Sequence, residues 1–86
     1  ARTFGKMTTE IRIKAEEAKR LKNDPAFKGF MVSVREAQIS VFMDSEADDI
    51  HAREEAHAMV RALNLIEVNL DAAIAAETLL DHRKRK

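Results

Sequence analysis

The longest uninterrupted segment of the chain runs from Glu46 to His82 and contains neither proline nor glycine. Because these two residue types end helices most effectively, the segment predicts one helix over about residues 46–82. At 1.5 Å per residue, such a helix is roughly 55 Å long. An 86-residue chain therefore has to pack its other residues along this one helix.

Two shorter helices are expected before it, over about residues 9–23 and 25–43. The Asp24-Pro25 step separates them, because proline disfavours the helical conformation in the preceding residue and is itself well placed at the start of a helix. A threonine at position 8 or 9 is predicted to cap the first helix, and Ser45 to cap the third.

The two ends of the chain show no helical pattern of their own. Residues 1–7 are expected to be a flexible arm, or residues left by an expression vector, and residues 83–86 a basic tail. Residues 8–82 are then expected to form one helical domain.

Apolar residues on the third helix recur with the four–three spacing of a coiled coil, interrupted at Glu77. Folding the chain at Ser45 places residue 36 against residue 54, so that the first two helices cover the third. The predicted intramolecular seam comprises Phe27, Phe30, Met31, Val34, Val41, Ala56, Met59, Leu63, Ile66, Leu70, Ala73 and Leu80.

A second apolar row runs beside the seam and is interrupted at Asn69. A two-arm hairpin cannot cover both rows, so this row is predicted to meet another subunit. Alternatively, the first helix folds back over it in a three-helix bundle. The predicted interface residues are Ala58, Ala62, Leu65, Ala72, Ala76 and Leu79.

Composition excludes several classes of protein. The chain has no cysteine, so it has no disulfide framework and no thiolate chemistry. No apolar run is long enough to span a membrane, and no secretion signal is recognisable. Glycine-rich phosphate loops and nucleophile motifs are missing, so the sequence predicts no catalytic residues and no cofactor.

The net charge of zero conceals a gradient along the chain. Residues 1–28 carry a net charge of +4, residues 29–57 of −5 and residues 58–86 of +1. In a hairpin the turn is then acidic and the open end is basic. The basic residues at the C-terminal end are predicted to contact a DNA backbone or an acidic partner protein: Arg83, Lys84, Arg85 and Lys86.

One short pattern suggests a metal site. The segment Glu54-Glu55-Ala56-His57-Ala58-Met59 reads Glu-x-x-His and resembles the metal-binding helix of encapsulated ferritins. That resemblance implies iron ligands at Glu54 or Glu55 and His57, with Glu36 as their partner from the second helix. The competing interpretation is a solvated, charged helix face.

A second resemblance covers more of the chain. The segment from Ile13 to Phe27, which contains the Asn-Asp-Pro-x-Phe step, is similar to small helical proteins encoded among the head and packaging genes of tailed bacteriophages and prophages. Arg53-Glu54-Glu55 before Leu63-Asn64-Leu65 continues that similarity. The resemblance implies a structural or packaging role, in a virion or the bacterial host cytoplasm, without enzymatic residues.

The sequence therefore predicts an all-α protein: an elongated antiparallel helical hairpin with its first arm kinked at Pro25, or a three-helix bundle with coiled-coil-like packing. The leading functional prediction is a non-enzymatic, oligomerising subunit of a phage particle or of its DNA-packaging machinery. Its partners would be further copies of itself, other proteins and, through the basic tail, DNA. The alternatives are a ferritin-like di-iron oxidase and a nucleic-acid-binding or host-directed adaptor.

Overall fold

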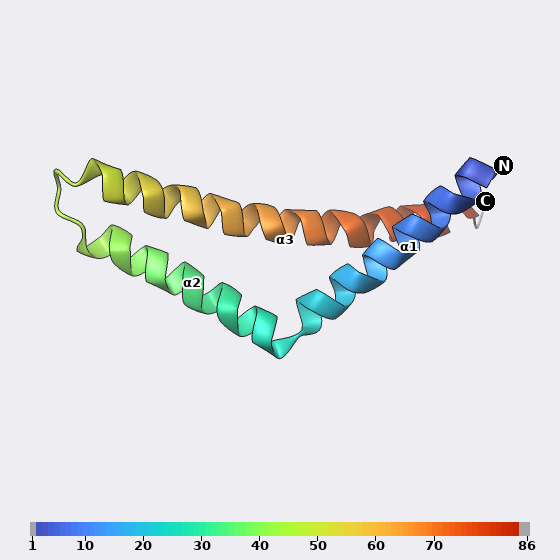
Figure 1. The fold of residues 1–86 in the computed structure, drawn as a ribbon, viewed down its shortest axis with the longest axis horizontal. Coiled ribbons are helices and arrows are strands. Elements are labelled where there is room, and N and C mark those ends of the chain that lie inside the picture. Colours follow the sequence, from blue (N-terminus) through green and yellow to red (C-terminus); the bar gives the residue numbers. More distant parts are fainter. Residues whose placement is uncertain (1, 85–86) are drawn as a thin grey trace. The chain divides into compact units, whose positions relative to one another are not determined.

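The computed structural model describes residues 2–84, and the side chains of residues 5–83, as three α-helices without a strand. The helices are α1 (Arg2–Asn23), α2 (Pro25–Asp44) and α3 (Ile50–Lys84) (Figure 1). The all-α prediction is confirmed. The chain divides into two compact units: unit 1 contains the residues up to Asp24 and from Val68 onward, and unit 2 is Pro25–Glu67.

Helix α1 begins at Arg2, earlier than the predicted start near residue 9, so residues 2–7 belong to the helix and not to an arm. The Thr9 hydroxyl does not cap the helix. It donates a hydrogen bond of 3.0 Å to the carbonyl of Gly5, four residues earlier, as threonines inside helices do. A single glycine costs a helix only about 1 kcal/mol, which does not suffice to end it here.

Asp24 separates α1 from α2. The Asp24 amide still donates to the Leu21 carbonyl over 3.1 Å, and the Asn23 side-chain amide donates to the Lys19 carbonyl over 2.9 Å. The first of these bonds gives a partner to one of the last four carbonyls of α1, which have none within the helix. Pro25 is the first residue of α2. The backbone N–H at this position has no partner within a helix, so its absence costs no hydrogen bond.

Residues 45–49 connect α2 to α3, and the cap of α3 differs from the prediction. Asp49, not Ser45, accepts the first-turn amide of Ala52 at 3.2 Å. The Ser45 hydroxyl instead donates to the Phe42 carbonyl and accepts from Arg53 Nε, each over 2.9 Å. The third helix therefore begins at Ile50, four residues later than predicted, and it continues to Lys84.

This later start changes the register of unit 2, in which α2 lies antiparallel beside the first half of α3 (Figure 1). Arg35 donates to Asn64 Oδ1 at 2.8 Å and to Glu67 Oε1 at 2.9 Å. Residue 35 thus lies opposite residues 64–67, whereas the hairpin predicted from a fold at Ser45 placed residue 36 opposite residue 54. The five-residue loop moves the fold point from residue 45 to residue 47 and so accounts for part of the difference.

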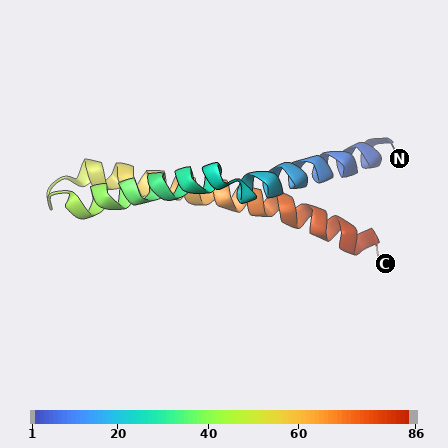
Figure 2. The ribbon, with the colours of Figure 1, turned by 90° about the horizontal axis from the view of Figure 1, so that it is seen from below.

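Unit 1 pairs α1 with the last part of α3, and small residues make its closest contact. Ala15 is fully buried and Ala18 nearly so. The two helices diverge toward the chain ends (Figure 2). Ion pairs from α1 to α3 flank the alanines: Lys19 Nζ to Glu77 Oε1 at 2.8 Å, Arg12 to Asp81 Oδ1 at 2.8 Å, and Lys22 to Asp71.

The heptad of α3 is used in a different phase from the predicted one. Ala56 and Leu63 are buried and Leu70 is half-buried, but Met59 and Ile66 are 45% and 42% exposed. One position beyond Met59, Val60 is half-buried, and one position beyond Ile66 lies Glu67. In unit 1 the predicted seam residues Ala73 and Leu80 are half-buried, as is Ile74. On α2 the predicted seam residues Phe27, Met31 and Val34 are half-buried, whereas Phe30 and Val41 are exposed.

Long arginines explain this phase. The row through Val60 and Ile74 also includes Glu67 and Asp81, and charged residues are not expected on the core-facing side of a helix. In the structure Arg35 reaches Glu67 and Arg12 reaches Asp81 from the opposite helix, so both carboxylates are paired at the seam. Both carboxylates also stay about half-exposed, so placing them there carries little desolvation penalty.

Candidate interaction surface

The predicted interface row of α3 lies on the surface. Leu65 is 58% and Leu79 54% exposed; Ala58, Ala62 and Ala72 are also exposed, and Ala76 is half-buried. None of these side chains belongs to the buried core of the described residues. They are therefore accessible to a partner.

The displaced seam residues add to this surface in unit 2. Arg35 forms its contacts with Asn64 and Glu67 along one edge of the seam between α2 and α3. At 100° per residue, six exposed apolar side chains fall along the other edge. We call this set the apolar face of unit 2: Phe30, Ala37, Val41, Met59, Ala62 and Ile66.

The apolar face of unit 2 is well exposed. Phe30 is 72% exposed, although it is among the largest apolar side chains in the chain. Contiguous exposed apolar residues are typical of surfaces that bind a protein, a membrane or a ligand. Sequence reasoning placed Phe30, Val41, Met59 and Ile66 inside the seam, because two phases of the heptad, one residue apart, fit the same apolar pattern.

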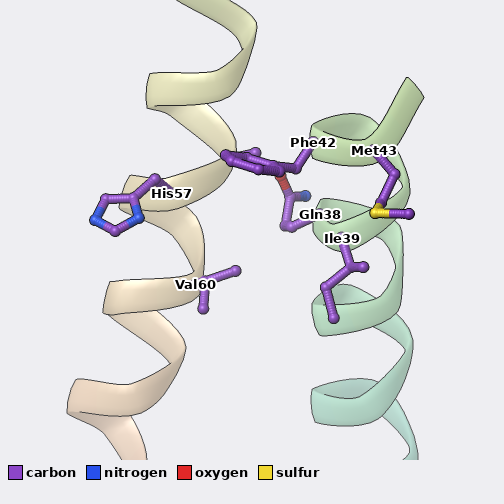
Figure 3. Close-up of a pocket in the computed structure, with 7 residues that line it drawn as sticks. Gln38, Ile39, Phe42, Met43, His57 and Val60 are labelled. Atoms are coloured by element: carbon purple, nitrogen blue, oxygen red, sulfur yellow. The ribbon is translucent and has the colours of Figure 1, made fainter. Parts of the chain in front are cut away.

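A small hollow near the turn of unit 2 is lined mainly by apolar atoms (Figure 3). Its volume is about 200 Å³, below the range of typical ligand sites. Figure 3 shows Phe42 and Val60 directed between the helices. Arg53 lies over the Phe42 ring, 5.7 Å from its centroid, so a cation–π contact supports this side of the turn. The lining residues are Gln38, Ile39, Phe42, Met43, Ala56, His57 and Val60.

The side chains suggested as iron ligands do not converge. Glu36, Glu54 and His57 are all exposed, and the His57 ring points away from α2 in Figure 3. With residue 35 opposite residue 64, Glu36 lies well along the seam from His57. Among the described residues, no group of three or more His, Asp or Glu side chains is placed to hold a metal. His51 instead pairs with Glu55 at 3.0 Å on the surface.

Three cations of α1 form ion pairs with α3: Arg12, Lys19 and Lys22. Hydrogen bonding to Asp81 raises the pKa of Arg12, and hydrogen bonding to Glu77 raises the pKa of Lys19. Glu77, which interrupts the predicted heptad, is buried and receives both cations, with Arg12 at 3.6 Å. A buried carboxylate between two cations is satisfied without any external partner.

The predicted phosphate-contacting residues are only partly described. Arg83 is exposed on the last turn of α3. Lys84 is helical, but its side chain, Arg85 and Lys86 lie outside the described residues.

Comparison with protein-family models, curated proteins and solved structures finds no match to this chain. Within residues 2–84, none of the helices combines the length and the hydropathy needed to cross a membrane.

Proposed function

We propose that this chain is a non-enzymatic helical subunit that acts by self-assembly. One observation carries the proposal: the buried apolar core of the described residues consists of Ala15, Ala18, Ala56 and Leu63. Among the described residues no large side chain is fully buried, and fifteen large apolar side chains are 40% or more exposed.

The physical reason is that a helix pair buries only one stripe of each helix. Apolar residues beyond that stripe remain in water unless a third helix covers them. At about 25 cal/mol per Å² of apolar surface, covering these residues supplies the free energy for association. Helices so rich in alanine also permit close approach of a partner helix.

The setting that we propose is a phage particle or its DNA-packaging machinery. The support is the resemblance of the segment from Ile13 to Phe27 to small helical proteins encoded among the head and packaging genes of tailed bacteriophages. A packaging role predicts that the protein is retained on non-specific DNA in a salt-dependent manner. Glutamine replacement of the basic residues 83–86 should lower that retention; retention unchanged by salt and by this replacement would contradict DNA contact.

The experiment that tests self-assembly is the solution mass, measured by light scattering after size exclusion at two protein concentrations. A mass at or above twice 9.7 kDa is expected. A mass of 9.7 kDa at both concentrations would overturn the proposal.

A matched pair of variants locates the interface. Leu65→Glu should lower the mass while the circular dichroism stays helical, because Leu65 is exposed in the single chain. Val32→Glu, on α2 and exposed to a similar extent at 55%, serves as the control and should leave the mass unchanged. Equal effects of the two changes would show that the association is not specific to the predicted row.

A further inference from the structure

We infer that two copies of this chain pack α3 against α3 in antiparallel orientation, with Asn69 at the centre of the contact. Unit 2 of one copy then contacts unit 1 of the other, and the contact occurs twice by two-fold symmetry. The inference rests on the proposed self-assembly and adds the partner surface, the orientation and the register.

Within about 80° of the direction of Asn69, taken at 100° per residue, every apolar residue of α3 is exposed or half-buried. We call these residues the outer face of α3. The residues of this face in unit 2 are Ala58, Met59, Ala62, Leu65 and Ile66. Those in unit 1 are Ala72, Ala73, Ala76, Leu79 and Leu80. Each lies as many residues before Asn69 as another lies after it. An antiparallel partner centred on Asn69 therefore matches every position of this face with another position of the same face.

Side-chain size also favours the antiparallel register over a parallel one. In this register Leu65 lies opposite Ala73 of the second copy, and Ile66 lies opposite Ala72. In these two layers, and where Leu80 lies opposite Ala58, a large residue thus meets a small one, which favours close packing; Met59 lies opposite Leu79 and Ala62 opposite Ala76. A parallel, in-register pair would instead set Leu65 against Leu65 and Ala72 against Ala72, which crowds one layer and leaves a void in the other.

The charges of the two units also favour the antiparallel orientation. Residues 1–24 and 68–86, which form unit 1, carry eleven Lys/Arg and seven Asp/Glu, for a net charge of +4. Residues 25–67, which form unit 2, carry four and eight, for a net charge of −4. Antiparallel packing brings each acidic unit against a basic one, whereas parallel packing brings like against like.

One particular pair shows this complementarity at the ends of the contact. In the same register Glu55 lies opposite Arg83 of the second copy, and both side chains are exposed in the single chain. The second copy is therefore the occupant that fits the outer face of α3 in spacing, size and charge.

Cysteine cross-linking tests the register, because the chain has no cysteine of its own. Asn69→Cys should form a disulfide-linked dimer under mild oxidation. A mixture of Ala62→Cys with an affinity-tagged Ala76→Cys should form the mixed dimer. Ala62→Cys alone should not cross-link, because its two copies would be separated by about 21 Å along the antiparallel helices. Val68→Cys, one residue from the centre but turned by 100°, is the matched control and should stay unlinked.

The outcomes separate the two proposals. Preferential Ala62–Ala62 linkage, or an oligomer that none of these cysteines links, would overturn the antiparallel register while self-assembly stands. A monomeric mass of the unsubstituted chain would overturn both.

A charge swap gives an independent measurement that needs no oxidation. Glu55→Arg and Arg83→Glu should each weaken dimerisation at least about fivefold, because each change affects two symmetry-related contacts. The double variant should restore the affinity. Glu36→Arg makes the same change in net charge on α2 and should have a smaller effect. Failure of the double variant to recover would contradict the Glu55–Arg83 pairing.

Discussion

Replacing Leu63 with alanine should destabilise unit 2 more than any other leucine truncation on the first half of α3. Leu63 is 6% exposed and is the one large side chain in the buried core of the described residues. Truncating a buried leucine to alanine costs about 2–5 kcal/mol. Only one helix covers it within the unit, so its neighbours can move into the vacated space, which favours the lower end, about 2–3 kcal/mol.

That loss is a large fraction of the roughly 4–13 kcal/mol expected for a chain of this length. It corresponds to a fall in Tm of about 10–20 °C, since 1 kcal/mol shifts a domain of this size by about 4–8 °C. The assay is thermal and urea unfolding, followed by circular dichroism at 222 nm at low protein concentration, where association contributes least.

Leu65→Ala provides the matched control on the same helix. Leu65 is 58% exposed in the single chain, so its truncation should lower the free energy of unfolding at low concentration by under about 1 kcal/mol. The burial argument would be refuted if the two substitutions destabilised the chain equally under these conditions, because α3 would then not present Leu63 to α2.

Three further predictions concern the helices and one ion pair. Gly29→Ala should stabilise the chain by about 1 kcal/mol, because an added methyl group meets no atom within 4 Å there; a lower Tm would reveal a partner packed close to α2. Asp49→Ala should cost about 1 kcal/mol through loss of the α3 cap, and Ser45→Ala less; the reverse order in urea unfolding would contradict the cap assignment. The pKa of Lys19 is raised above its ordinary 10.5 by its hydrogen bond to Glu77, so its contribution to stability is complete below pH 10.5 and is lost as the pH rises through the raised value. Lys19→Gln should therefore flatten the alkaline decline in Tm, and a decline that persisted unchanged would assign it to other groups.

The heptad illustrates how far the sequence could predict the seam. Ala56 and Leu63 belong to both possible phases, so their burial follows from spacing alone. Met59 and Val60 compete for the next position, and hydropathy favoured the row that avoids Glu67 and Asp81. In the structure Arg35 and Arg12, on different helices, pair with these carboxylates, so their charge does not keep this row away from the seam. A pattern read along one helix contains no information about cations on another.

The sequence by itself determined the local features of this protein: the all-α class, the break at Asp24-Pro25 and the long third helix. These follow from backbone preferences and from proline and glycine, which act within a few residues. Only the tertiary structure decided the cap at Asp49, the register that places Arg35 opposite Asn64, and which apolar residues stay in water. The reason is physical. A helix with apolar residues on more than one side can turn several faces toward its neighbours, and the loop length and the cross-helix ion pairs select among them.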